Sequence, residues 1–402
     1  MKLNAIKFEK ANGGMGRPSA SKDVISGLIF GGMGLNFGSA IGSISGFDSA
    51  DGGSYIKKFL YPEELEDCGI VYKQYESTAL QDEECAMNAL YYHVSEYFRI
   101  NPNGVLYVMV KGGTTAVAAT DLQVLQNYAN GEVRQVGVYA AALPDVATFQ
   151  TALVALEAEH KPMSCIVTYS GKDVTLDTLK DAEIREEGKC NVSVLVGCDF
   201  TPQLSGDLGD YAYYGCIGAC MGAISKAAVH ECIAWVQKFP LGLVSPALFN
   251  GNLIRNVSNQ DQELLNNNYI FVITHVGDAD CYFNDSHTLD VSDSDYAYIE
   301  NVRTIDKACR GVYANMLPHL AGPLQVDAST GKLAASTVAF LETEAGRALE
   351  DMEKAGELSG YKAEIDPEQN VLATSVLQIV IKQVGIGVMR TVNVKIGFAT
   401  KI

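Results

Sequence analysis

Two alternating stretches near the C-terminus, Ser375-Val-Leu-Gln-Ile-Val-Ile-Lys-Gln-Val384 and Thr391-Val-Asn-Val-Lys-Ile-Gly-Phe398, decide the fold of the last part of this 402-residue chain. Alternation of polar and apolar residues is the pattern of a β-strand with one buried face. In the first stretch the odd positions Leu377, Ile379 and Ile381 share a face. In the second the even positions do so: Val392, Val394, Ile396 and Phe398. A terminal strand of this kind needs a pairing partner, because it otherwise exposes a row of backbone donors and acceptors.

Two helices are expected before these strands. The first spans Tyr298 to Leu317 and is stopped by Pro318, and the second is an acidic helix from Ser336 to Gly360. Helical spacing predicts that the second helix buries one apolar face, made of Val338, Leu341, Ala345, Leu349 and Met352. Two helices followed by two strands predict an α+β domain over residues 298–402.

Charged residues form two groups on these helices. In the first helix they recur at i, i+3, i+4 and i+7, a spacing that predicts an ion-pair network bracing two domains: Arg303, Asp306, Lys307 and Arg310. In the second helix four of them lie opposite the apolar face: Glu344, Arg347, Asp351 and Lys354. These four are either a solvated surface or a contact with a partner.

Residues 23–297 alternate between strand and helix. Asp23 to Phe30 is a first core strand or short helix, and Glu83 to Tyr97 is a helix. Apolar strands follow at Val105–Val110, Val133–Tyr139, Met163–Thr168 and Val192–Gly197. Helices are expected between them near Asp121–Ala129, Asp145–Glu159 and Asp173–Glu187. Apolar strands separated by helices predict an α/β sandwich, a mostly parallel sheet covered on both faces.

The N-terminal residues 1–22 are predicted to be an arm. Met1 to Lys10 is strand-like, with Leu3, Ile6 and Phe8 as its apolar residues, and the glycine-rich residues 11–22 are typical of a tether. A strand on a tether at one end, with a strand at the other end, favours exchange of strands between subunits. Pairing of both strands within their own chain is the alternative.

Composition excludes several classes of protein. The net charge of −18 argues against broad nucleic-acid binding, which requires a basic surface. We expect no membrane insertion and no secretion, because neither a long apolar run nor a basic-then-apolar leader is present. The ten cysteines are scattered through apolar segments and are expected to be reduced core thiols.

The sequence does not predict a catalytic, cofactor or metal site. Gly32 to Gly38 has the wrong spacing for a dinucleotide loop, and in Lys111 to Thr115 the lysine precedes the glycines, unlike a phosphate loop. The six histidines show no metal-binding spacing. Several aspartates between Asp278 and Asp295 do not follow the order of a calcium loop, so we expect a solvated turn there.

Several motifs nevertheless resemble a known family. Gly13 to Pro18 with Asp23 to Ile29, the segment Ala223 to Val236, and Cys281 to Asp285 followed by Tyr298 to Arg310 are similar to phage-type contractile tail sheath proteins. The last motif is the most specific, with a short strand followed by an N-x-R-x-x-D-K-x-x-R helix. This resemblance touches both ends and the middle of the chain and is weak between about residues 54 and 188.

The resemblance implies a structural subunit rather than an enzyme. Such subunits form stacked six-membered rings around a tail tube and contract without a nucleotide to drive the tube through a target envelope. It implies that the arms add strands to a neighbour's C-terminal sheet, that Gly13–Pro18 and Gly385–Gly387 are flexible connections, and that a helix of the tube-facing domain 298–402 holds the tube. The implied partners are further copies of the chain, the tube protein, and baseplate and tail terminator proteins.

The resemblance also implies a place for the protein. It predicts a virion tail or an injection-system particle that is assembled in the bacterial cytoplasm. Two other classes stay open at this point. A nucleotide-binding α/β enzyme would explain the alternating strands, and another self-assembling shell or tube protein would explain the apolar termini.

Overall fold

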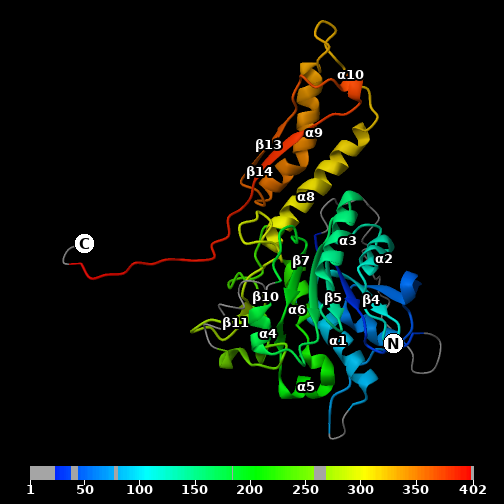
Figure 1. Cartoon of the computed structure of the whole chain (residues 1–402), viewed down its shortest axis with the longest axis vertical. Helices are drawn as coiled ribbons and strands as arrows, with labels where there is room; N and C mark the ends of the chain where they lie inside the picture. The colour runs from blue at the N-terminus through cyan, green and yellow to red at the C-terminus, as the bar shows by residue number, and fades with distance from the viewer. Residues whose placement is uncertain (1–22, 38–43, 77–79, 183, 258–268, 400–402) are drawn as a thin grey trace, which may run out of the picture.

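The computed structural model describes residues 23–37, 44–76, 80–182, 184–257 and 269–399. They form an α/β body and a narrower C-terminal domain that projects from one end of the body (Figure 1). The last described residues leave the molecule sideways near the junction of the two parts. The predicted strand at Met1 to Lys10, with Leu3, Ile6 and Phe8, lies outside the described residues.

One sheet organises the body. Its strands lie in the order β10-β7-β6-β5-β1-β4-β3-β2. All neighbours from β10 to β4 run parallel, and β3 and β2 are antiparallel at the edge. The bounds are β1 Ile25–Phe30, β2 Asp48–Ala50, β3 Ser54–Phe59, β4 Val105–Lys111, β5 Gln135–Ala140, β6 Ser164–Tyr169, β7 Val192–Leu195 and β10 Tyr269–Ile270. This confirms the mostly parallel sheet.

Helices cover both faces of this sheet. Leu28 and Phe30 of β1 point into a core shared with α1 and α6, whereas Ile25 and Ile29 point to the opposite side, toward α2 and α3. Every residue of β1 is buried, as expected for a central strand between two helical layers. The helices are α1 Asp82–Ile100, α2 Thr120–Tyr128, α3 Val146–Ala158 and α6 Ile217–Lys226.

Small residues allow α6 to lie directly on α1. A Cβ atom built on Gly218 would lie 1.9 Å from the carbonyl oxygen of His93, and one on Gly222 would lie 2.8 Å from that of Tyr97. Only glycine therefore fits at these two positions. The helix ends at Lys226, where Ala227 takes an extended conformation with ψ 136°, and the carbonyls of Ala227 and Ala228 accept hydrogen bonds from the Arg303 guanidinium.

The remaining elements of the body are short. The helix expected at Asp173–Glu187 is α4, which spans only Leu176–Asp181 and begins at a Thr175 cap. Strand β8 pairs with β9, and β11 pairs with β12, both antiparallel. Their bounds, with the fifth helix, are β8 Gly197–Asp199, α5 Pro202–Leu208, β9 Pro246–Leu248, β11 Val272–Thr274 and β12 Cys281–Phe283. The ten cysteines all lie within the described residues and are free thiols.

The C-terminal domain is a helical pair against a hairpin. Its elements are α8 Ile299–Met316, α9 Ala335–Lys354, β13 Gly360–Glu364, α10 Val371–Thr374 and β14 Val380–Val384. Leu349 and Met352 of α9 pack with Ala308 of α8, and Val229 of the body joins the same cluster. Leu341 packs nearer the tip with Leu333 and Ile365. The domain thus has its own small cores, one of which extends to the body.

Two predicted bounds in this domain are wrong. Helix α9 ends at Lys354 rather than Gly360, because Gly356 takes a left-handed φ of 77° and the Glu357 amide turns back to the Met352 carbonyl. Strand β14 begins at Val380 rather than Ser375. The side chain of Gln369 bonds both the amide and the carbonyl of Gln378, which a strand would use for its ladder.

Candidate assembly surfaces

The hairpin of β13 and β14, which the resemblance implies would receive a neighbour's strand, buries the predicted apolar face of Leu377, Ile379 and Ile381 in part. Strands β13 and β14 pair in antiparallel register from Gly360 with Val384 to Glu364 with Val380. Leu377 and Ile379 are half-buried against the Leu341 cluster, and Ile381 is half-buried against the Leu349 cluster. All three therefore face the helices of their own chain, and a partner strand would meet the hairpin at its edge.

The second alternating stretch forms no strand in the single chain. Residues 391–399 run away from the body as an extended segment (Figure 1), and their side chains are exposed. The exposed fractions rise along the predicted apolar face, from 62% at Val392 and 70% at Val394 to 89% at Ile396 and 111% at Phe398. Exposed apolar side chains on an unpaired segment are typical of a surface that is covered by a partner.

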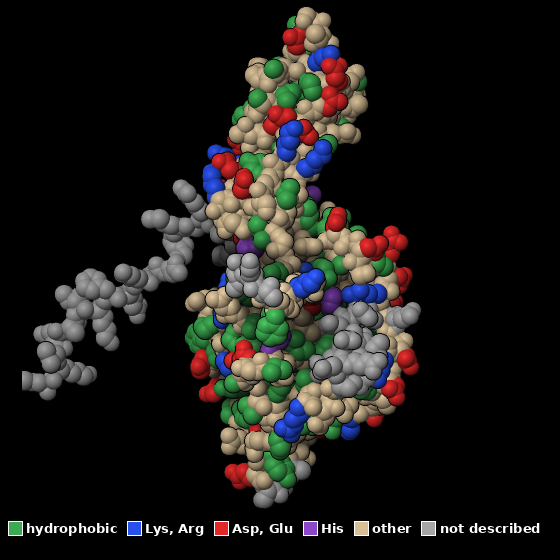
Figure 2. All heavy atoms as spheres, turned by 90° about the vertical axis from the view of Figure 1, so that its left-hand side faces the viewer, with side chains coloured by type: hydrophobic (Ala, Val, Ile, Leu, Met, Phe, Trp, Pro, Cys, Tyr) green, Lys and Arg blue, Asp and Glu red, His purple; other side chains and the backbone are tan. Residues whose placement is uncertain are grey.

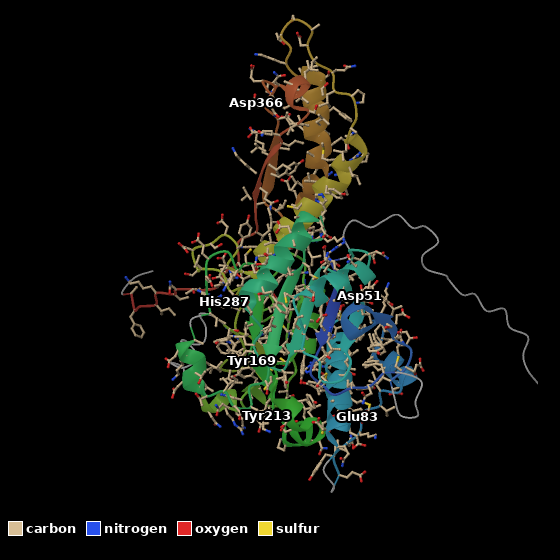
Figure 3. The ribbon with its side chains drawn as sticks, turned by 45° about the vertical axis from the view of Figure 1, so that its right-hand side comes forward. Asp51, Glu83, Tyr169, Tyr213, His287 and Asp366 are labelled. Atoms are coloured by element: carbon tan, nitrogen blue, oxygen red, sulfur yellow. The ribbon has the colours of Figure 1, made fainter. Side chains whose placement is uncertain are left out.

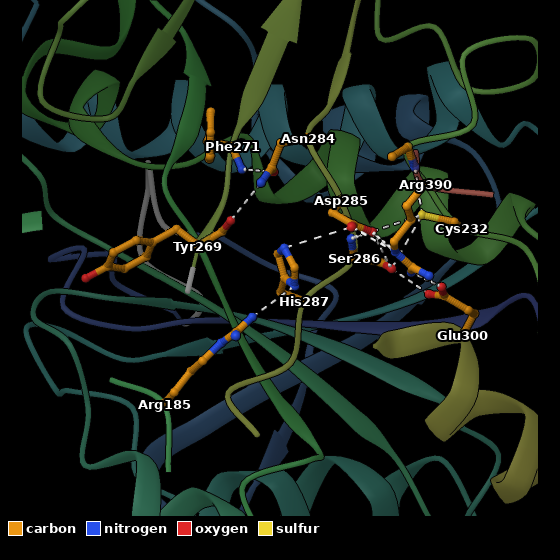
Figure 4. A network of polar contacts seen from close by, with 11 residues as sticks. Arg185, Cys232, Tyr269, Phe271, Asn284, Asp285, Ser286, His287, Glu300 and Arg390 are labelled. Carbon is orange, nitrogen blue, oxygen red and sulfur yellow. Dashed lines mark hydrogen bonds and ion pairs between the residues drawn. The ribbon is translucent and has the colours of Figure 1, made fainter. Parts of the chain in front are cut away.

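Arg390 holds the start of this segment on the body (Figure 4). Its guanidinium donates from Nε to Asp285 Oδ2 at 2.9 Å and from Nη2 to Glu300 Oε1 at 2.5 Å. The Arg390 Cζ atom lies 3.4 Å from the centre of the Tyr298 ring, a cation–π contact. Glu300 is 2% exposed and also accepts from Ser286 Oγ at 2.5 Å. The sequence analysis did not predict this site. Asp285, Tyr298 and Glu300 nevertheless belong to the motif that carries the family resemblance most specifically.

Burial and pairing act against each other in this cluster. Burial works to raise the pKa of Glu300, and this effect exceeds the lowering by Ser286 and Arg390. For Arg390, burial works to lower the pKa, but Asp285 and Glu300 outweigh it and the net pKa is raised. The arginine therefore stays charged, and its charge compensates carboxylates that are withdrawn from water. Figure 3 places the neighbouring His287 on the side of the body from which the C-terminal segment leaves.

The predicted ion-pair helix joins the two parts of the molecule. Lys307 Nζ lies 2.8 Å from Asp23 Oδ2, just before β1, and 2.6 Å from Glu357 Oε1, just before β13. Arg310 Nη2 lies 3.1 Å from Asp23 Oδ1. Arg303, also on α8, donates to the end of α6 instead of to a carboxylate.

Asp306 makes none of the ion pairs described for its neighbours on α8. Its carboxyl is buried, and this burial raises its pKa to about 7. Of the four predicted residues of this helix, only Lys307 and Arg310 therefore contribute to an ion-pair network.

The charges on α9 are largely paired within the helix. Glu344 lies 3.3 Å from Arg347, and Lys354 lies 2.6 Å from Glu350. Arg347, Asp351 and Lys354 are exposed, whereas Glu344 is only partly so. Figure 2 shows acidic and basic side chains mixed on the face of the C-terminal domain that it displays. The predicted tube contact at these four residues stays a prediction.

The lysine of the glycine-containing loop after β4 is already paired within the chain. Lys111, the lysine of the loop that resembles half of a phosphate loop, is buried and pairs with Asp121 at 2.8 Å. It also donates to the Gly52 carbonyl at 2.8 Å. Within the described ranges, no group of three or more His, Cys, Asp or Glu side chains is arranged to hold a metal ion. Nor does any helix in these ranges have the length and apolarity needed to cross a bilayer.

The whole chain matches solved structures of contractile machines. The contracted helical sheath of the anti-feeding prophage (AFP) aligns with a TM-score of 0.61 at 16% identity over 99% of both chains. The contracted PVC sheath complex of an extracellular contractile injection system aligns with a TM-score of 0.61 at 12% identity, covering 100% of this chain and 99% of that one. A chain of the AFP baseplate aligns with a TM-score of 0.58 at 14% identity over 100% of both.

Two family models match this chain, one over the body and one over the C-terminal domain. No curated protein sequence matches. The model "DUF2586, N-terminal domain" matches residues 3–287, and "DUF2586, C-terminal domain" matches residues 295–402. Because the first model alone spans more than half of the chain, this protein belongs to the DUF2586 family, and its fold is that of contractile-sheath subunits.

Proposed function

We propose that this protein is the structural subunit of a contractile sheath. Its fold aligns over nearly the full length of two sheath subunits. The observation that carries the proposal is the C-terminal segment, whose apolar side chains are 62–111% exposed from Val392 to Phe398 in the single chain. Such a segment has a physical use only when a partner covers it.

In this proposal the subunits form stacked six-membered rings around a tube. Residues 1–22 and 391–402 are arms that add strands to the C-terminal sheet of neighbours, residues 23–297 form the outer part, and residues 298–402 face the tube. Roughly five ladder hydrogen bonds per added strand, at about 1 kcal/mol each, give several kcal/mol per joint before side-chain burial. That free energy keeps neighbours connected while their domains reorient.

Contraction is a change of packing between subunits and requires no catalysis by this chain. The subunits assemble in an extended, metastable state and release free energy as they bury more surface between them. The tube protein contacts α9 near Glu344, Arg347, Asp351 and Lys354, and baseplate and terminator proteins close the two ends. We propose assembly in the bacterial cytoplasm as part of a virion tail or an injection particle. The relatives are parts of a prophage-derived particle and of an extracellular injection system.

The test compares the two faces of the C-terminal segment. Val394→Asp with Ile396→Asp places two charges on the apolar face, and Asn393→Asp with Lys395→Gln changes the net charge by the same amount on the other face. All four positions are exposed, so neither variant should alter the fold of the subunit. We expect ribbed cylinders in negative-stain electron microscopy from the wild type and from the second variant.

The first variant, and a chain lacking Met1 to Lys10, should give only monomers or short rings. Cylinders from both apolar-face and polar-face variants would refute strand exchange through this segment. Monodisperse monomers from the wild type, with or without a tube, would refute the sheath assignment itself.

A further inference from the structure

The span between β14 and the exposed segment is held at both ends. Upstream, the Ser359 amide donates to the Val384 carbonyl at 2.8 Å and the Ser359 hydroxyl to the Gly385 carbonyl at 3.0 Å. Downstream, Arg390 is bound to Asp285 and Glu300. Between these points Ile386 and Val388 are half-buried, whereas every residue from Met389 to Ala399 is exposed. The Arg390 side chain itself is 28% exposed. The exposed part therefore starts where the arginine is fixed.

We propose that Arg390 is the root of the C-terminal arm, so that the part able to move to a neighbouring subunit begins at Thr391. This inference rests on the proposed function, because it assigns a position to the arm's pivot. It differs from the expectation that Gly385 to Gly387 is the flexible connection. The residues that hold the root are Asp285, Tyr298 and Glu300, from the segment after β12 and the start of α8.

The buried carboxylate explains why the root stays in place. Glu300 is 2% exposed, and its partners are Arg390 and the Ser286 hydroxyl. Withdrawing the guanidinium would leave this carboxylate in the protein interior with only neutral donors, which is far costlier than loss of a surface ion pair. Arginine suits the position because its planar group binds two carboxylates in its plane and stacks on the Tyr298 ring through its face.

The position of the root decides which contacts bear tension on the arm. A pull on residues 391–402 would act on Arg390 and pass into α8 and the body. If the pivot were at Gly385, the same pull would act on the end of β14 and would peel a two-stranded ladder of five residue pairs. The same helix also holds Asp23, next to the predicted N-terminal arm, through Lys307 and Arg310. Helix α8 thus fixes the chain at the start of both arms.

Trypsin tests the root in the unassembled subunit, isolated by size-exclusion chromatography. Trypsin must take a basic side chain into its own pocket, so a bound Arg390 should resist cleavage before Thr391. Exposed Lys395, in the same segment, is an internal reference. A synthetic peptide of residues 386–399 gives the intrinsic ratio of the two cleavages. Intact-mass spectrometry follows the products that end at residues 390 and 395.

We expect cleavage at Arg390, relative to Lys395, to be about tenfold or more slower in the protein than in the peptide, because cleavage requires release of the root. Arg390→Lys keeps a trypsin site and leaves the body untouched, but it loses the two-carboxylate geometry, and it should recover most of the peptide's ratio. Asp285→Asn with Glu300→Gln should do the same.

The matched control is Gly385→Ala with Gly387→Ala. A Cβ atom at either glycine meets nothing within 4 Å, and neither has a left-handed φ, so the change restricts the span without a clash. This variant should keep the wild-type cleavage ratio and form cylinders as the wild type does. A wild-type ratio equal to that of the peptide would overturn the proposal. Loss of cylinders in the glycine variant would also overturn it, since the pivot would then lie at those residues. The cleavage result does not depend on assembly, so it stands whether or not the sheath assignment holds.

Discussion

Lys307 should be the residue whose loss most weakens the junction between the body and the C-terminal domain. Its ammonium bonds Asp23 on one side and Glu357 on the other, and its side chain is 15% exposed. Removing one partner of a buried ion pair costs about 3–5 kcal/mol, because the remaining charge has no compensation. Asp23 keeps Arg310 at 3.1 Å, which lowers the loss on that side. We therefore expect Lys307→Met to reduce the free energy of unfolding by about 2–3 kcal/mol.

The assay is urea unfolding of the unassembled subunit, followed by the fluorescence of Trp235, the one tryptophan of the chain. Glu357→Gln in the Lys307→Met background should restore about 1 kcal/mol, since it removes the uncompensated charge. The matched control is Lys354→Met on α9, where an exposed lysine pairs with exposed Glu350 and the change should be negligible. A loss below about 0.5 kcal/mol for Lys307→Met, or strict additivity with Glu357→Gln, would refute a buried bridge.

The pH dependence gives an independent check of the same bridge. Burial works to raise the pKa of Asp23, but Lys307 and Arg310 lower it, and the net pKa lies below the ordinary value. A depressed pKa stabilises the fold at pH values above the unfolded pKa of about 4, and this stabilisation is lost as the pH falls through the folded pKa. The difference between wild type and Lys307→Met should therefore shrink below about pH 4.

Two further predictions concern the body and its contact with α8. Burial raises the pKa of Asp306 to about 7, so wild-type stability should decline as the pH rises from about 4 to 7, and Asp306→Asn should flatten that decline in thermal unfolding measured across this range. An unchanged slope in the variant would contradict a buried, protonated carboxyl. Gly218→Ala would place a Cβ atom 1.9 Å from the His93 carbonyl oxygen, and we expect it to lower the free energy of unfolding by about 3 kcal/mol or to prevent folding. Gly385→Ala, with open space around the new Cβ, is its control in the same urea experiment, and equal stability of the two variants would show that α6 can shift off α1.

Much of the body could be read from the sequence because its signals are local. The apolar runs of β4 and β6, and the Asp145 cap at the start of α3 between them, follow from strand and helix patterns within a few residues. The same holds for the apolar stripe of α9, where Leu341, Ala345 and Leu349 are buried as predicted. These patterns depend on residue spacing and on no distant contact.

Two features that the sequence analysis did not predict depend on side chains that bond backbone groups outside the local apolar pattern. The Arg303 guanidinium, distant in sequence, donates to the carbonyls of Ala227 and Ala228 directly after the end of α6. Strand β14 starts late because Gln369 bonds the backbone of Gln378. Periodicity cannot reveal such contacts, since a side chain that competes for a backbone group leaves no mark on the local apolar pattern.

The sequence by itself determined the parallel sheet, the helical pair and the alternating apolar face of the last segment, because each is set by the order of neighbouring residues. Tertiary structure alone decided which partner each of the four charged side chains of α8 contacts. Lys307 and Arg310 meet Asp23 across the junction, Arg303 closes α6, and Asp306 is enclosed. It alone also decided that Arg390 is tied down while the residues after it are exposed. Helical spacing predicts which charged side chains share a face of a helix. The partner of each side chain depends on which distant segment packs against that face.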